Sequence, residues 1–413
     1  MSQGGKRTRN KRDSASRGRV FRRMGESSGL SVSDAICLRL RSRYSECSFC
    51  VDACPVGAIR FSDDSLDVSS ACLGCARCAA ACPTGALKAN RFPDLSVLPR
   101  AALEAGVLEV ECARVPRRAA AKNALRLRCA GGIGAHDLLG LYADRGYRDL
   151  RVIARGLCGD CPASDHGRHP AAAAVSEARA LLEGFGAPYA EGVAFEFRRL
   201  PQGARPLPTP HAEPEPDASR RDFLRRLAGI PQAEPAADAT PARATAKLIP
   251  ASKARLMMAL ERVAKSAGGA LPARLFPRIE ISNSCADHGV CAVVCPTGAL
   301  ARYEEDGASG LRFEAAACIA CEDCVRACPE RAIRCSGPGN ALPDVFGPVR
   351  LTCFTTAECY ECAREFPVTG EARLCPTCRK TRDLARTSFS QLFGAARNPH
   401  GERMPMETSA GTD

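Results

Sequence analysis

The sequence predicts an α+β protein of several domains, in which two cysteine-rich units flank a small α/β domain and a four-cysteine ribbon follows. The first reason is size, because 413 residues are too many for one compact unit of the cysteine-rich kind. The second is the distribution of the 25 cysteines, of which sixteen form two similar groups of eight at residues 35–96 and 273–342. The third is the alternation of strand-like and helix-like stretches between these groups, which is typical of a mainly parallel sheet.

These patterns divide the chain into eight expected segments. They are a basic disordered arm (1–34), the first cysteine-rich unit (35–96), an α/β four-cysteine domain (97–199), a Pro- and Ala-rich linker (200–250), a helix (251–272), the second cysteine-rich unit (273–342), a zinc-ribbon-like segment (343–386) and a tail (387–413). Within the linker, only residues 220–227 look helical. The helix at 253–266 is expected to pack on the second cysteine-rich unit.

Charge and composition narrow the class of protein. The net charge is +12, and residues 1–43 alone carry twelve Lys or Arg against three Asp or Glu. Such an arm can bind nucleic acid, an acidic partner protein or an anionic membrane surface. The alternative is a solvated disordered tail, because no aromatic residues for base stacking are interleaved with the basic ones. No run of about eighteen apolar residues occurs, so no membrane span is expected. Because adjacent Cys-x2-Cys pairs suit metals in a reducing compartment better than disulfides, we expect a soluble cytoplasmic protein.

Four cysteines are each followed by proline and a short turn into an aliphatic stretch: Cys54, Cys82, Cys295 and Cys328. Two of them close complete Cys-x2-Cys-x2-Cys-x3-Cys-Pro runs, which start at Cys72 and Cys318. Soft, charged thiolates at this spacing can wrap three corners of an iron–sulfur cube, with the fourth ligand supplied from elsewhere. The runs therefore predict iron–sulfur clusters.

Residues 37–90 and 283–335 resemble the bacterial two-cluster ferredoxins, in which the cysteine before proline ligates the other cluster of the pair. The resemblance implies four [4Fe-4S]-type ligand sets. We name each set by its first residue: the Cys54 set (Cys54, Cys72, Cys75, Cys78), the Cys37 set (Cys37, Cys47, Cys50, Cys82), the Cys295 set (Cys295, Cys318, Cys321, Cys324) and the Cys285 set (Cys285, Cys291, Cys328).

Two of these sets depart from the family pattern. Tyr44 stands where the family has the first cysteine of one ladder, and Cys37 is the expected substitute, because residues 38–45 can loop back. The alternative is that Cys37 is a buried free thiol. His288 stands at the missing position of the Cys285 set. The gap resembles that of a family variant with a non-cysteine residue at this position, which holds a three-iron cluster, so the resemblance implies a three-iron or labile cluster here. One alternative is that His288 ligates the iron directly and raises the reduction potential, and another is that His288 is a surface residue that binds nothing.

The middle segment carries a further candidate site. Strands are expected at 107–112, 125–129, 150–154 and 193–197, with helices at 136–144 and 172–184. If the strands are parallel, their carboxyl ends bring together Cys112, Cys129, Cys158 and Cys161, the Cys112 set. This stretch resembles the iron–sulfur delta subunit of methyl-viologen-reducing hydrogenases, and the resemblance implies a further iron–sulfur cluster on these residues. Zinc or unligated core thiols remain as alternatives.

Near the C-terminus, two Cys-x2-Cys knuckles are separated by twelve residues. Their spacing favours one structural zinc on Cys359, Cys362, Cys375 and Cys378, the Cys359 set. A rubredoxin-type iron would use a longer intervening segment. Cys335 and Cys353 have no clear partners and are expected to be structural thiols.

Residues 219–225 match the twin-arginine export motif, but they lie far from the N-terminus and no apolar segment follows. The motif also resembles the beginning of the cytoplasmic ferredoxins associated with periplasmic nitrate reductase, which implies that the second half arose as a separate protein.

No phosphate-binding loop and no nucleophile–base pair is visible, so we expect no enzymatic activity beyond the clusters. The leading hypothesis is a multi-cluster electron-transfer protein that relays electrons between a donor and a partner oxidoreductase. The alternative is an iron–sulfur redox sensor or assembly factor that binds nucleic acid or a client enzyme.

Overall fold

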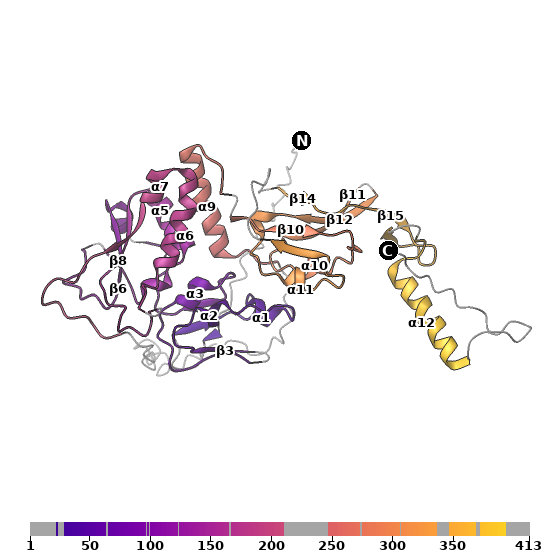
Figure 1. Ribbon diagram of the computed structural model, residues 1–413, viewed down its shortest axis with the longest axis horizontal. Coiled ribbons are helices and arrows are strands. Elements are labelled where there is room, and N and C mark those ends of the chain that lie inside the picture. The colour runs from indigo at the N-terminus through magenta and orange to yellow at the C-terminus, as the bar shows by residue number, and fades with distance from the viewer. Residues whose placement is uncertain are drawn as a thin grey trace, which may run out of the picture.

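The computed structural model describes residues 22–23, 29–62, 65–95, 97–98, 100–122, 124–164, 167–209, 247–272, 275–305, 307–336, 347–368 and 372–393. The two cysteine-rich units and the α/β domain lie against one another, and the C-terminal helix stands apart from them (Figure 1). Helices and strands are mixed throughout these residues, as expected for an α+β protein. None of the described helices is both long and apolar enough to span a bilayer.

The first cysteine-rich unit combines a three-stranded antiparallel sheet and an antiparallel strand pair with three short helices. Strand β2 (Leu30–Val32) pairs with β5 (Leu87–Ala89) and with β1 (Arg22–Arg23), while β3 (Ile59–Phe61) pairs with β4 (Leu66–Val68). The helices are α1 (Leu38–Arg41), α2 (Phe49–Asp52) and α3 (Arg77–Ala81). Strand β2 lies inside the segment expected to be a disordered arm, because its buried apolar side chains close the core of this unit. Residues 1–21 and 24–28 of that arm lie outside the described residues.

The second cysteine-rich unit repeats this layout. Strand β10 (Arg278–Ile281) pairs with β13 (Ile333–Ser336), as β2 pairs with β5, and the hairpin of β11 (Leu300–Glu305) and β12 (Ala308–Phe313) corresponds to β3 and β4. Helices α10 (Val290–Val294) and α11 (Asp323–Arg326) correspond to α2 and α3, and a 3-10 turn, η4 (Ala315–Ala317), precedes α11. The repeat in the sequence is therefore a repeat in the fold.

The middle domain is built on a parallel sheet with strand order β7-β6-β8-β9. Its strands are β6 (Leu108–Cys112), β7 (Leu125–Leu127), β8 (Leu150–Ala154) and β9 (Val193–Phe197). Its helices are α4 (Arg100–Glu104), α5 (Ala135–Asp144), α6 (Ala172–Leu182) and α7 (Ala187–Glu191), with 3-10 turns η1 (Ala130–Gly132) and η2 (Glu183–Phe185). The expected strands and helices are thus observed, except that β7 ends at Leu127 rather than at Cys129.

Helix α9 (Ala251–Ala267) packs mainly on the middle domain, so the expectation that it packs on the second cysteine-rich unit was wrong in its main part. Leu260 and Val263 belong to the core that contains α5, whereas Met257 belongs to the core of the second unit. Ser252 also reaches the first unit, since its Oγ donates to the carbonyl oxygen of Pro83 at 3.4 Å. Helix α9 therefore contacts all three parts. The possible helix at 220–227 and the export-like motif lie outside the described residues.

The C-terminal segment continues the sheet of the second unit. Strand β14 (Val349–Arg350) and strand β15 (Phe354–Glu358) both pair with β12, and β15 pairs with β16 (Glu365–Pro367). Helix α12 (Pro376–Phe393) continues past residue 386, where the tail was expected to begin. It projects away from the rest of the described chain (Figure 1).

Candidate iron–sulfur and metal sites

The Cys54 set gathers around one cavity in the first unit. All four of its cysteines line a space of about 310 Å³ together with Val56, Ile59 and Gly74. Burial raises the pKa of Cys78 well above its usual value, and the neighbouring Cys75 and Cys72 raise it further. The structure therefore brings together the four residues that the ferredoxin pattern assigns to one cluster.

The loop that carries this set has an unusual backbone that recurs twice in the second unit. Gly74 and Ala76 have φ values of 61° and 65°, and the corresponding Ala320 and Glu322 have 52° and 60°. Left-handed residues turn the chain sharply enough for successive cysteines to point to one side. In the Cys285 set, Asp287 at 49° and Gly289 at 69° repeat the pattern. His288 therefore occupies the same position in its loop as Cys75 and Cys321 do in theirs.

The Cys37 set is also brought together, although its loop differs. Burial raises the pKa of Cys37 to about 11, and Cys82 and Cys47 are the neighbouring thiols that add to the rise. The pKa of Cys50 is raised to about 12 by burial and then by Cys82, Cys37 and Cys47. Residues 44–50 contain none of the left-handed residues of the other loops. Residues 38–41, expected to be a flexible loop, form helix α1, which begins directly after Cys37.

Tyr44 stands at the position of the missing cysteine, and its hydroxyl and carbonyl oxygens bond to arginine side chains. Its hydroxyl accepts a hydrogen bond from Nη2 of Arg43 at 2.7 Å, and its carbonyl oxygen accepts one from Nε of Arg326 at 2.7 Å. The second bond crosses to helix α11 of the other cysteine-rich unit. Tyr44 thus belongs to a contact between units.

The Cys295 set lines a cavity of about 370 Å³ in the second unit. Burial raises the pKa of Cys318 to about 11 and that of Cys321 to about 12, with Cys295 among the contributing thiols. Cys335 lines the same cavity from strand β13. Sequence spacing gave no signal for this placement, because Cys335 reaches the cavity through the pairing of β13 with β10. Cys353, the other unassigned thiol, is exposed.

The Cys285 set contains three neighbouring thiols and no fourth cysteine. Burial raises the pKa of Cys291 to about 11, and Cys285 and Cys328 add to the rise. Nε2 of His288 is hydrogen-bonded to a carboxylate oxygen of Glu330, two residues after Cys328. In metal sites, a carboxylate on one imidazole nitrogen commonly orients the other nitrogen toward the ion. The alternatives of ligation and no ligation by His288 are therefore both compatible with this contact.

Backbone amides point at the sulfur atoms before each proline. The N–H groups of Ala58, Ala86 and Ala332 donate to Cys54, Cys82 and Cys328 at 3.2, 3.2 and 3.3 Å. In the fourth motif the N–H of Leu300 donates to Cys295 at 3.4 Å. Such bonds stabilise negative charge on sulfur and are one way in which a protein adjusts the potential of an iron–sulfur cluster.

The middle domain places the Cys112 set around a cavity of about 590 Å³ at the carboxyl edge of its parallel sheet. Cys112 ends β6, and Cys158 and Cys161 follow β8. Burial raises the pKa of Cys158 to about 11, and the nearby thiols of Cys112 and Cys161 add to the rise. Arg114, Arg128 and His169 line the same cavity. The expected convergence of the four sulfurs is therefore observed.

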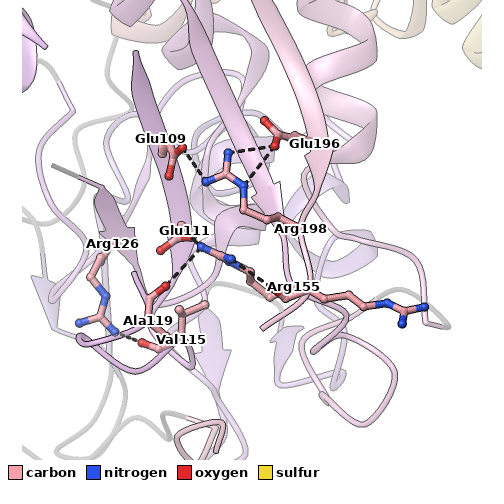
Figure 2. A network of polar contacts seen from close by, with 9 residues as sticks. Glu109, Glu111, Val115, Ala119, Arg126, Arg155, Glu196 and Arg198 are labelled. Atoms are coloured by element: carbon pink, nitrogen blue, oxygen red, sulfur yellow. Dashed lines mark hydrogen bonds and ion pairs between the residues drawn. The ribbon is translucent and has the colours of Figure 1, made fainter. Parts of the chain in front are cut away.

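A buried ion pair holds the strand ends that form this cavity. Glu111 of β6 is fully buried and pairs with Arg155, which directly follows β8 and is 5% exposed (Figure 2). On the same sheet, Arg198 bridges Glu109 and Glu196 at 2.8 and 2.9 Å (Figure 2). Removing one partner of a buried pair typically costs about 3–5 kcal/mol. Glu111 and Arg155 thus fix the edge on which Cys112 lies.

The Cys112 set and the Cys54 set are neighbours. Cys75 and Leu73 line the middle cavity, and Cys129 packs with Leu73 and Ala163 in a small cluster to which Cys75 also belongs. Burial raises the pKa of Cys129, and Cys75 is the first of the thiols that add to the rise. No residue spacing in the sequence indicates this contact.

The Cys359 set has the arrangement of a single metal site. All four sulfur atoms lie within 4.8 Å of one another. Cys359 and Cys362 lie in the connection between β15 and β16, while Cys375 and Cys378 lie at the start of α12. The N–H of Cys375 donates to Cys359 at 3.2 Å and is the largest cause of a lowered Cys359 pKa, about 6. A thiolate at neutral pH surrounded by three further sulfurs suits a tetrahedral ion such as zinc.

The donor chemistry of the other sets fits iron–sulfur clusters. All of their cysteines are free rather than disulfide-bonded. For most of them burial raises the thiol pKa, as for Cys50, Cys78 and Cys324. Several thiolates in one small apolar space repel one another, so a cationic group such as iron is needed to stabilise them there.

Comparison with known families agrees with this for one part of the chain. The model of a family described as a 4Fe-4S dicluster domain matches residues 45–86. Seven of the predicted ligands lie in the matched segment, and Cys37 lies before it. No curated protein matches the chain. Residues 45–86 therefore match a 4Fe-4S dicluster domain, and this match together with the clustered cysteines supports iron–sulfur binding by this part of the chain.

Proposed function

We propose that this chain is an electron-transfer protein that carries clusters in two ferredoxin-like units and in the α/β domain between them. The observation that carries the proposal is the convergence of cysteines into the Cys54, Cys37 and Cys295 sets, each with four neighbouring thiols. The three-cysteine Cys285 set and the Cys112 set extend this arrangement. The Cys359 set would hold a structural zinc ion.

Each iron–sulfur cluster, when bound, supplies reversible one-electron oxidation and reduction. The residues of the chain bind the iron through sulfur, exclude water with apolar walls such as Ile59 and Phe313, and direct backbone N–H groups at the sulfurs. His288 and Tyr44 make two of the sites unequal, so that their potentials are expected to differ. A redox partner protein or oxidoreductase complex in a reducing, cytoplasmic compartment would supply and accept the electrons.

The α/β domain supports a role beyond that of a simple carrier. Its four-cysteine cavity lies at the sheet edge where open α/β sheets commonly place ligands. In this proposal the domain is the part that connects the ferredoxin-like units to the partner, as implied by its resemblance to the hydrogenase delta subunit.

The test is purification without air, followed by iron, sulfide and zinc counts and a potential titration monitored by electron paramagnetic resonance. Several reversible clusters over a spread of potentials, with about one zinc per chain, are expected. The double variant Cys75→Ser/Cys321→Ser should lose iron, whereas the control variant Cys353→Ser should not. Colourless, iron-free protein, or one oxygen-labile cluster linked to nucleic-acid binding, would contradict the electron-transfer proposal.

A further inference from the structure

The two cysteine-rich units touch at one place where a ligand set of each unit lies next to the contact. Helix α11 of the second unit follows Cys321 and contains Cys324, both of the Cys295 set. It faces residues 41–45 of the first unit, which directly precede Cys47 of the Cys37 set. The position of the missing ladder cysteine, Tyr44, lies in this contact.

Arg326 provides the direct bonds across the contact. Its Nε donates to the carbonyl oxygen of Tyr44 at 2.7 Å, and its Nη2 donates to the carbonyl oxygen of Cys321 and contacts Asp323 at 3.2 Å. One guanidinium therefore connects the backbone beside Cys47 with the backbone of a ligand in the other unit.

Asp323 is fully buried in the same contact. Burial raises its pKa, while Arg326, Ser42 and Ser45 oppose the rise. Its carboxylate contacts Arg326 on its own helix and the hydroxyls of Ser42 and Ser45 in the first unit. Asp323 therefore lies within the contact between the two units.

A second connection runs beside the first. Nζ of Lys247 donates to the carbonyl oxygen of Cys295 at 2.9 Å, and the N–H of Leu248 donates to that of Pro296 at 2.7 Å. A few residues later, Oγ of Ser252 donates to the carbonyl oxygen of Pro83 at 3.4 Å. The segment therefore links the Cys-Pro turn of the Cys295 set to the Cys-Pro turn of the Cys37 set.

We infer that α11 and residues 247–252 join the two units so that the five cysteine sets form one ordered series. The order is the Cys285 set, the Cys295 set, the Cys37 set, the Cys54 set and the Cys112 set. This inference deepens the proposed electron-transfer function and rests on it.

Each remaining link is supported by a separate observation. The Cys285 and Cys295 sets share helix α10, since Cys291 lies within it and Cys295 directly follows it. Cys50 of the Cys37 set and Cys78 of the Cys54 set are both buried in the single core of the first unit. Cys75 of the Cys54 set lies against Cys129 of the Cys112 set. The cavity with Arg114 and Arg128 is therefore one end of the series, and the His288 site is the other.

The order can be tested with full-length protein that retains only two clusters. One variant keeps the Cys37 and Cys295 sets and carries Cys75→Ser, Cys78→Ser, Cys285→Ser, Cys291→Ser, Cys158→Ser and Cys161→Ser. The matched variant keeps the Cys54 and Cys295 sets, which are both complete and are not adjacent in the proposed order, and carries Cys47→Ser, Cys50→Ser, Cys285→Ser, Cys291→Ser, Cys158→Ser and Cys161→Ser. The readout is the magnetic interaction between the two reduced clusters, measured by pulsed electron paramagnetic resonance.

The first variant is expected to show the stronger interaction, because its two sets flank the contact. An interaction no stronger than in the matched variant, with iron present in both, would overturn the order while leaving the electron-transfer function intact. Iron-free wild-type protein would overturn both.

A less disruptive pair of variants tests the contact itself. Arg326→Ala is expected to weaken the physical contact between the two units. Amide hydrogen exchange at residues 42–47 should therefore increase, while the iron count stays unchanged. Arg312→Ala removes a half-exposed arginine of β12 that pairs with Glu305 at 3.9 Å and serves as the control. Equal effects of the two substitutions on hydrogen exchange at residues 42–47 would overturn the role of Arg326, even if the serine variants fail to fold.

Discussion

The two cysteine-rich units have the same layout of strands and helices, but each accommodates a missing cysteine differently. In the second unit, the loop of the Cys285 set keeps both left-handed residues, and His288 takes the position of the absent cysteine. In the first unit, the corresponding loop lacks these residues, and Cys37, the residue proposed to complete the set, lies directly before helix α1. The second unit keeps the backbone of the other ligand loops and has histidine in place of cysteine, whereas the first unit has a different backbone at this loop.

The contact between the units gives a physical reason for this difference. Residues 42–45 bind Arg326 and surround Asp323, so this stretch is used for docking and does not form a ligand loop. The loop around His288 faces Glu330 and is braced by Asp287, whose carboxylate accepts from Ser309 at 2.9 Å and pairs with Arg302 at 3.2 Å. Because residues 42–45 take part in the contact, they do not adopt the left-handed backbone of the other ligand loops.

The largest expected effect is that of Cys37→Ser. If Cys37 completes its set, this change should open one corner of that cluster, as in the Cys285 set, so that at least about one iron atom per chain is lost and the remaining cluster becomes labile. Iron and sulfide counts on anaerobic protein measure the loss, and Cys353→Ser, at an exposed thiol, is the control. An unchanged iron content in Cys37→Ser would show that the cluster uses no sulfur from this residue.

The next effect concerns the other gap. His288→Cys should add about one iron atom per chain and lower the reduction potential of that site, because a thiolate is anionic and imidazole is neutral. Iron counts and a potential titration measure the change. Glu330→Gln keeps the shape of the partner of His288 and should leave the iron count unchanged. If the wild-type site already holds a complete four-iron cluster, the three-iron hypothesis is wrong and ligation by His288 is favoured.

Ser309→Ala tests whether the brace on the second loop matters. Ser309 is fully buried and donates to Asp287, so its loss should destabilise this loop by about 1–3 kcal/mol. Release of iron from the Cys285 set is therefore expected at a lower denaturant concentration than in wild-type protein. Ser62→Ala, at an exposed serine of the first unit, is the matched control. Identical release curves would mean that the loop conformation does not depend on this bond.

The smallest effect concerns the turn after each Cys-Pro pair. Gly57 and Arg331 occupy equivalent positions and both have left-handed φ values, 59° and 51°. Arg331→Gly should stabilise the protein by about 1 kcal/mol, and Gly57→Ala should destabilise it by a similar amount, because no atom lies within 4 Å of the added Cβ. Shifts of the same sign in the two unfolding midpoints would contradict this explanation.

Several features were predictable because they depend on local patterns. The Cys-x2-Cys runs predicted which thiols line the same cavity, because these thiols are close in sequence. The strand and helix periodicity predicted the elements of the parallel sheet. Helix α9 was less predictable, since its apolar stripe shows that one face is buried but not against which neighbour. The extent of α12 was also missed, because its polar sequence has little apolar periodicity.

The sequence by itself determined the candidate ligands, since short loops of fixed spacing bring neighbouring thiols together whatever surrounds them. Only the tertiary structure decided which sets are neighbours. Cys75 meets Cys129, Cys335 enters the Cys295 cavity and Tyr44 meets Arg326 through contacts between distant segments. Such contacts depend on how whole elements pack, and packing depends on surfaces that a local pattern does not specify.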